Sequence, residues 1–243
     1  MTFARLATYF QKIEDIASRL EITGLLSDLF KEIEATEIDK VLYFLQGRLG
    51  PLYEKLDFGM GEKLVTSAAA QSFEEEKGLF TKLVSQKGDI GLAIEEAKNL
   101  HKNATYKNLT VTEVFTRLDE IARATGTGSQ EKKLTLLAEL ISDADPLSAK
   151  FIVRIPVNML RLGFSDMTIL DGLSWMVTGD KSLRKDIEKA YHVLPDIGYI
   201  GKTMKEKGIE GLAHVKPKLF VPILMMKAER LSSGQEIIDK INE

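Results

Sequence analysis

Residues 3–20, FARLATYFQKIEDIASRL, decide the fold class. Their apolar side chains recur at steps of three and four residues, which places them on one stripe of a helix with 3.6 residues per turn: Phe3, Leu6, Phe10, Ile13, Ala17 and Leu20. Almost every other segment has the same kind of periodicity, and we find no convincing alternation of apolar and polar residues that would predict a strand. We therefore expect an all-α protein with about ten to twelve helices, given a usual helix length of about 11 residues.

Helix boundaries are marked at several places. Two pairs fit the capping box, in which a side-chain oxygen and an acid satisfy backbone amides of the first turn: Ser72 with Glu75, and Thr110 with Glu113. Asp145 followed by Pro146 predicts an N-cap and a first-turn proline. Pro156 lies inside the periodic stretch 149–160, where its missing amide predicts a kink or a break.

Composition and charge exclude several classes of protein. The chain has 243 residues, 44% of them hydrophobic and 28% charged, which is ordinary for a globular fold. It has no run of eighteen uncharged apolar residues and several charges among its first twenty, so we expect a soluble, cytoplasmic protein without a signal peptide. There is no Cys, and the three His have no metal-ligand spacing, so we expect neither disulfides nor a metal site. The net charge is −5 over residues 1–120 and +2 over residues 121–243, which weakly favours the C-terminal half for contact with a polyanion.

Internal similarity predicts a duplication. Residues 10–17 match 115–122 in character, RLG at 48–50 returns at 161–163, and DIG at 89–91 returns at 196–198. The three pairs keep their order, at offsets of 105, 113 and 107 residues. We predict two helical repeats related by a pseudo-twofold axis, about 1–108 and 109–214, followed by a connector at 215–243. Chance recurrence of short motifs is the alternative.

Both DIG motifs follow a break in the helical pattern and begin a new helix. A helix N-terminus with glycine nearby can hold a phosphate through its free backbone amides. The residues concerned are Lys87, Gly88, Asp89, Ile90, Ile197 and Gly198. The alternative is purely structural, with the two Asp as N-caps and the glycines as turns.

A third turn, GTGSQEKK at residues 126–133, combines glycines, hydroxyls, a helix start and two lysines. This composition predicts an anion site made by Gly126, Thr127, Gly128, Ser129, Gln130, Lys132 and Lys133, although a capped turn with solvated lysines is equally compatible. The stretch lacks the Gly-Lys-Ser/Thr ending and the preceding strand of a nucleotide-binding P-loop. Farther along, LRLG at 160–163 is expected to end a helix, with Gly163 as a left-handed cap and Arg161 reaching outward.

Together these motifs resemble the N-terminal DNA-binding domain of ATP-dependent DNA ligases, particularly the archaeal kind. The similar segments are TGTGSQEKK at 125–133, LRLG at 160–163, KGDIG at 87–91 and DIGYIGK at 196–202, and the likeness extends over essentially the whole chain. The resemblance implies sequence-independent binding of nicked duplex DNA across the minor groove, through the residues named above and Lys202. It implies a parent protein that seals nicks in replication, repair and recombination. Two residues depart from the family pattern: Met225, where a second proline is usual, and Pro156, in place of an apolar helix residue.

The family's nucleotidyl transfer uses a Lys-x-Asp-Gly motif, which is absent from this sequence. The resemblance therefore assigns no catalysis and no cofactor to this chain, and ATP and Mg²⁺ to the parent enzyme alone. Two stretches, GIEGLA at 208–213 and VPILMM at 221–226, resemble the connector toward an adenylation domain. The expected partner is double-stranded, nicked DNA, a sliding clamp is a further candidate, and we expect a monomer without membrane contact.

Two alternatives come from other classes of protein. An α-helical repeat scaffold would present a concave face to a protein partner. A small helical enzyme would need a catalytic site, and neither the dispersed His nor the exposed Glu pairs predict one. Salt-sensitive binding of duplex DNA separates the DNA-binding hypothesis from both.

Overall fold

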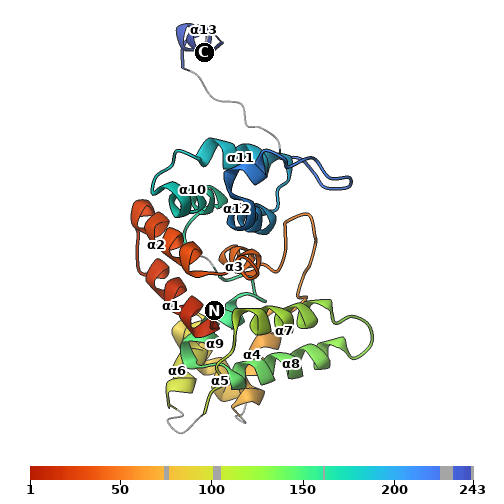
Figure 1. The fold of residues 1–243 in the computed structure, drawn as a ribbon. Helices are drawn as coiled ribbons and strands as arrows, with labels where there is room; N and C mark the ends of the chain where they lie inside the picture. The colour runs from red at the N-terminus through yellow and green to blue at the C-terminus, as the bar shows by residue number, and fades with distance from the viewer. Residues whose placement is uncertain (74–76, 101–104, 161, 225–231, 242–243) are drawn as a thin grey trace.

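The computed structural model describes residues 1–73, 77–100, 105–160, 162–224 and 232–241, and within these ranges the chain forms thirteen helices and no strand (Figure 1). The helices are α1 (Phe3–Glu14), α2 (Arg19–Glu32), α3 (Ile38–Leu45), α4 (Glu62–Ser72), α5 (Lys77–Lys87), α6 (Ile90–Leu100), α7 (Val111–Arg123), α8 (Ser129–Asp143), α9 (Pro146–Arg154), α10 (Asp166–Thr178), α11 (Arg184–Val193), α12 (Ile197–Leu212) and α13 (Gly234–Ile241). The all-α prediction is confirmed, with one helix more than the expected range.

The stripe that predicted the first helix is buried over only part of its length. Phe3, Leu6, Phe10 and Ile13 are buried on α1. The helix ends at Glu14, and a second helix begins after Ser18, whose hydroxyl accepts a hydrogen bond from the Glu21 amide. Ala17 and Leu20 therefore lie on the surface and do not extend the stripe, because a new N-cap interrupts it.

Two of the predicted helix starts are confirmed and one is wrong. At α7 the Thr110 hydroxyl accepts from the Glu113 amide at 3.1 Å, and the Glu113 carboxylate accepts from the Thr110 amide at 2.7 Å. At α9 the Asp145 carboxylate accepts from the Ser148 amide, directly before Pro146. Ser72 instead ends α4 and donates its hydroxyl back to the Ala69 carbonyl, and its expected partner Glu75 lies outside the described residues.

The helix expected over 149–160 is shorter than its periodicity suggested. It ends at Arg154, two residues before Pro156, because proline supplies no amide to continue the ladder. The break at Pro156 is confirmed. The prediction that LRLG at 160–163 ends a helix is wrong for the residues that the structure describes, because 155–160 and 162–165 are non-helical and lead to α10.

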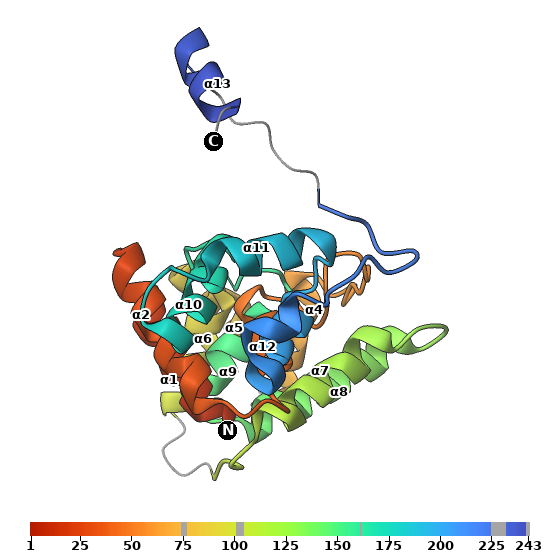
Figure 2. The ribbon, with the colours of Figure 1, turned by 45° about the horizontal axis from the view of Figure 1, so that its top comes forward.

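Most helix contacts of the first six helices have a counterpart among those of the next six. Figures 1 and 2 show the arrangement. Helix α2 packs on α10 and α8 packs on α4, while α12 packs on α3 and α6 packs on α9. Each of these contacts joins one half of the chain to the other, so the halves interlock around one hydrophobic core. This pairing is the one that two related repeats would give, and the twofold relation itself stays a prediction.

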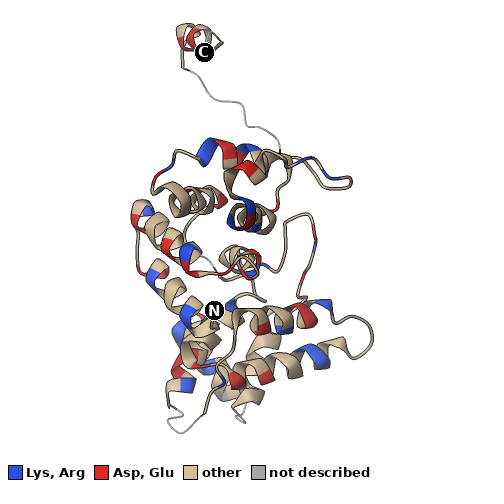
Figure 3. Ribbon diagram, viewed as in Figure 1, with Lys and Arg blue, Asp and Glu red and all other residues tan. Residues whose placement is uncertain are grey.

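Basic and acidic residues are interspersed along most helices and do not separate into two regions of the fold (Figure 3). Among the described helices, none is long and apolar enough to cross a membrane. A binding surface for a polyanion must therefore be sought in particular turns and loops and not in the overall charge.

Candidate nucleic-acid interface

The turn between α7 and α8 presents its backbone to solvent. Gly126 and Gly128 have φ angles of +87° and +79°, which favour glycine, and residues 125–128 are exposed. Gly128 is the N-cap of α8 and has no side chain to cap the first turn. The Ser129 amide donates to the Gly126 carbonyl at 3.2 Å, which leaves the amides of Gln130 and Glu131 available to an anion.

The two lysines of this turn have different environments. The Lys132 ammonium lies 3.1 Å from the Glu120 carboxylate, and both side chains are more than half exposed, so this ion pair is weak and easily exchanged for a phosphate. Lys133 is buried, and its ammonium donates to the Phe58 carbonyl at 2.5 Å. The prediction that Lys133 joins Lys132 on one surface is therefore wrong, because a carbonyl 75 residues earlier in the chain takes its ammonium inward.

The start of α6 is closed by its own side chains. Asp89 accepts from the Leu92 amide at 2.8 Å, and its carboxylate also pairs with Arg154 at 3.0 Å. Lys87 forms an ion pair with Glu96, and Ile90 is fully buried. Gly88, with φ of +68°, is exposed in the turn. The N-cap alternative for Asp89 is confirmed, and the neighbouring Asp89 carboxylate disfavours a phosphate at these amides.

The start of α12 has the same arrangement with other partners. Asp196 accepts from the Tyr199 amide at 3.0 Å and from the Tyr43 and Tyr53 hydroxyls at 2.6 and 3.3 Å. Burial, reinforced by Asp196, raises the pKa of Tyr43 far above its ordinary value and that of Tyr53 to about 12. Ile197 is buried, so this helix start faces the protein interior.

Glycine at both helix starts allows close helix packing. A Cβ on Gly91 would lie 2.6 Å from the Lys150 carbonyl oxygen of α9, and one on Gly198 would overlap the Tyr43 ring of α3. The close approach that these glycines permit is thus made to a neighbouring helix. Lys202, one turn beyond Gly198, is half-buried.

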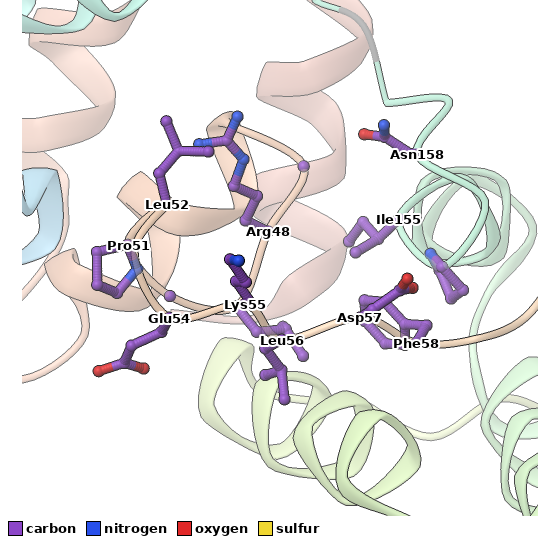
Figure 4. A pocket seen from close by; sticks show the side chains of 14 residues that line it. Arg48, Pro51, Leu52, Glu54, Lys55, Leu56, Asp57, Phe58, Ile155 and Asn158 are labelled. Atoms are coloured by element: carbon purple, nitrogen blue, oxygen red, sulfur yellow. The ribbon is translucent and has the colours of Figure 1, made fainter.

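Residues 47–61 form a loop, here called the 47–61 loop, that joins the other parts of the site. Its Phe58 carbonyl holds Lys133 of α8, and its Tyr53 hydroxyl reaches Asp196 at the start of α12. The loop also faces residues 155–158 across a cleft of about 340 Å³ (Figure 4).

Arg48 is the most informative residue in this cleft. Its side chain is half-buried, and within the described ranges its guanidinium makes no hydrogen bond or ion pair. Lys55 and Asn158 line the same cleft (Figure 4). The acidic residues Glu54 and Asp57 also line the cleft, but within the described ranges neither forms an ion pair with Arg48. The Arg48 guanidinium is thus available to an anionic ligand.

A second cleft of about 350 Å³ continues from Arg48 and Asn158 to Gly163. Gly163 is exposed with φ of +77° and precedes α10, while Arg161 lies outside the described residues. Asp166, which also lines this cleft, is engaged by the Gln46 amide and the Tyr191 hydroxyl.

Sequence reasoning missed the part of the site that the 47–61 loop supplies. In the sequence, Arg48 is distinguished only as a member of a repeated tripeptide. No pattern distinguishes Lys55 or Asn158. Asn158 has φ of +54°, a conformation that Asn tolerates better than most residues, so a turn could have been expected there. No sequence signal predicts that this turn meets the 47–61 loop.

Comparison with known proteins gives a consistent result. The model of the family described as DNA ligase N terminus matches residues 2–174. A probable DNA ligase of Dictyoglomus turgidum is 41% identical over 244 residues, covering 100% of this chain and 41% of that protein. A DNA ligase of Saccharolobus solfataricus is 39% identical over 251 residues, covering 99% of this chain and 42% of that protein. The chain thus spans about two fifths of the length of these relatives.

Proposed function

The chain belongs to the DNA ligase N terminus family, and from this premise we propose that it binds nicked duplex DNA without sequence preference. Membership confirms the resemblance seen in the sequence. A ligase domain has to accept any sequence, and contacts to the phosphate backbone provide affinity without reading bases.

The observation that carries the proposal is the half-buried, unpaired Arg48 between the 47–61 loop and residues 155–158. Lys55 adds a second cation to this cleft, and the exposed glycine backbone at 126–128 is linked to the same loop through Lys133. We assign phosphate contact to Arg48, Lys55, Lys132 and the backbone amides of Gln130 and Glu131. Lys133 is left out, because its ammonium is used internally.

The proposed role in a longer protein follows from the relatives, which are named DNA ligases. There the domain would hold the duplex while other parts of the protein use ATP and Mg²⁺ to seal the nick. This chain contains no Lys-x-Asp-Gly motif, so incubation with labelled ATP and Mg²⁺ should leave it without a covalent AMP adduct.

Fluorescence anisotropy with nicked duplexes of two unrelated sequences, at several salt concentrations, tests the proposal. Neutralising about 4 to 8 phosphates gives a log–log salt slope of roughly −4 to −7, nearly equal for both sequences. Arg48→Ala and Lys132→Ala should each weaken binding to both sequences and reduce the slope by about one.

Lys31→Ala is the matched control. Lys31 is about half exposed, on α2, and α2 lies on the opposite side of the molecule from the α7–α8 turn (Figures 1 and 2). The control should keep the slope of the unmodified protein. Salt-insensitive binding, or equal effects of all three substitutions, would reject this interface and favour the protein-scaffold alternative.

A further inference from the structure

The segment after α12 makes a strained turn with an aromatic residue at its tip. The Val221 amide donates to the Lys218 carbonyl at 3.1 Å, and Phe220, at the third position, has φ of +66°. This bond and this φ are those of a type II turn, whose third residue is normally Gly because a side chain there is strained. Residues held in strained backbone conformations cluster at functional sites.

The tip is apolar, basic and open to solvent. Phe220 is fully exposed and Leu219 is 85% exposed, so neither side chain contributes to the core. Lys216 and Lys218 directly precede them in the chain and are also exposed, and residues 215–224 contain no Asp or Glu. An apolar pair that follows two lysines, with no acidic residue in the segment, is complementary to a polyanion that also offers an apolar surface.

The turn is held in place at its base. Pro217 and Pro222 restrict the backbone on both sides, and the Leu224 amide donates to the His192 carbonyl at 3.0 Å. The tip is therefore presented in a defined conformation by the end of α11.

The turn projects on the same side of the molecule as the candidate DNA interface. In both Figures 1 and 2 the segment that follows α12 and the turn between α7 and α8 extend toward the same side, and the 47–61 loop lies between α12 and α7 on that side. A duplex held by Arg48 and Lys132 would run close to this tip.

We propose that Phe220 is an apolar wedge that enters the minor groove of the bound duplex, while Lys216 and Lys218 lie against the flanking phosphates. Apolar side chains that enter a minor groove partly unstack a base step, and a nick makes such a step easier to open. The proposal rests on the proposed DNA-binding function and adds the tip that contacts the bases.

Phe220→Gly tests the wedge with two measurements of opposite sign. Because Gly adopts positive φ without strain, the variant should melt about 2 °C higher than the unmodified protein. Because the ring is lost, it should bind a nicked duplex about tenfold more weakly, with an unchanged salt slope. Ile223→Ala, which shortens another exposed apolar side chain of the same segment, should change affinity less than about twofold.

Unstacking of the bases can be measured directly by 2-aminopurine fluorescence. A nicked duplex with 2-aminopurine beside the nick should gain fluorescence when the unmodified protein binds, and Phe220→Gly should remove that gain. Lys218→Ala should instead lower the salt slope by about one.

The outcomes separate this proposal from the function on which it rests. Full affinity and full 2-aminopurine signal with Phe220→Gly would overturn the wedge, while loss of slope with Arg48→Ala would still support DNA binding. Absence of salt-dependent binding in the unmodified protein would overturn both. If Phe220→Gly abolishes a dimer in sedimentation and leaves DNA affinity unchanged, the tip is a protein contact and the wedge is wrong.

Discussion

Two helix contacts in this molecule share one backbone arrangement and differ in chemistry. In one, the start of α12 packs on α3, and in the other, the start of α6 packs on α9. Each packed helix has an Asp N-cap and a glycine as its second residue, and the Asp accepts a hydrogen bond from the helix beneath it. The donor is the Tyr43 phenol in the first contact and the Arg154 guanidinium in the second.

The two donors occupy the same position relative to the turn that follows their helix. The Arg48 amide reaches back to the Tyr43 carbonyl at 2.9 Å, and the Met159 amide reaches back to the Arg154 carbonyl at 2.8 Å. In each case the residue before that amide, Gly47 or Asn158, has a positive φ. Helices α3 and α9 are thus both followed by a Schellman motif. Because the two turns are alike, Tyr43 and Arg154 reach their Asp acceptors from equivalent positions.

The difference lies in what each donor requires. Tyr43 is neutral and is satisfied by Asp196, whereas Arg154 is a buried cation that also pairs with Glu14 at 2.7 Å. Glu14 in turn holds Lys150, whose side chain is only 4% exposed. Both contacts therefore combine an Asp acceptor, a glycine and a hydrogen-bond donor. Only the contact with a charged donor requires further ion pairs around it.

Arg154→Met breaks the charged contact and should have the largest effect. Asp89 loses its buried cationic partner and Glu14 keeps only Lys150, so we expect a loss of about 3–5 kcal/mol in the free energy of unfolding. Urea unfolding measures the loss. A change below about 1 kcal/mol would mean that the network is solvated and that the two contacts do not differ as described.

Gly91→Ala and Gly198→Ala test the shared spacing. The Cβ on Gly91 meets the Lys150 backbone carbonyl, which cannot move alone, while the Cβ on Gly198 meets the Tyr43 ring, which can rotate. We expect losses of about 3 kcal/mol for Gly91→Ala and about 1–2 kcal/mol for Gly198→Ala. Gly24→Ala on α2 is the matched control, because nothing lies within 4 Å of its Cβ, and it should stabilise the protein by up to about 1 kcal/mol. Equal losses at the two sites would contradict the distinction between backbone and side-chain neighbours.

A second pair of equivalent residues differs in burial. Lys98 on α6 donates to the Ile141 carbonyl near the end of α8, and Lys205 on α12 donates to the Lys31 carbonyl near the end of α2. Burial lowers the pKa of Lys98 to about 8, with Asp145 and Asp143 opposing the shift, and lowers the pKa of the less buried Lys205. Both lysines thus donate to a backbone carbonyl near the end of a helix, but they differ in how strongly burial disfavours the charged ammonium.

The depressed pKa of Lys98 predicts a rise in stability with pH. The folded protein releases this proton near pH 8 and the unfolded chain near pH 10.4, so between these values the unfolded state binds more protons and the free energy of unfolding increases with pH. The difference between the unmodified protein and Lys98→Met should change by on the order of 2 kcal/mol from pH 7.5 to 10. The corresponding difference for Lys205→Met should vary less over this pH range. A larger variation for Lys205→Met than for Lys98→Met would contradict the assigned order of burial.

Local chemistry could be predicted from the sequence more fully than the site. Thr110 with Glu113, Asp145 with Pro146 and the break at Pro156 depend on neighbours within a few residues, and the structure has all three. Lys133 shows the limit, because a lysine in a first helical turn can face either way and only the Phe58 carbonyl decides its direction. Arg48 shows it again, because its cleft exists only where two loops about a hundred residues apart meet.

Of the two repeated tripeptides, DIG occupies equivalent positions in the two halves of the chain and RLG does not. The DIG pair marks equivalent helix starts, with Gly91 and Gly198 each packed on the other half of the chain. The RLG pair is displaced, since the Schellman motif aligns Gly47 with Asn158, an offset of 111 residues, against 113 for Arg48 and Arg161. Loop length is less constrained than helix packing, which accounts for the two extra residues. Superposition of residues 10–91 on 115–198 would test the twofold axis.

Tyr43→Phe should give the smallest effect, and its size sharpens the comparison most. The substitution removes one hydroxyl and leaves the ring that Gly198 packs against. Asp196 keeps the Tyr199 amide and the Tyr53 hydroxyl, so its carboxylate is not left unpaired, and we expect a loss of about 1 kcal/mol in urea unfolding. The loss should stay below that of Arg154→Met because no charge is stranded. Tyr53→Phe is the control, since its hydroxyl is farther from Asp196, at 3.3 Å against 2.6 Å, and should contribute less. If Tyr43→Phe lowers the free energy of unfolding as much as Arg154→Met does, the neutral and the charged donor contribute equally. The ion pairs around Arg154 would then have no separate energetic role.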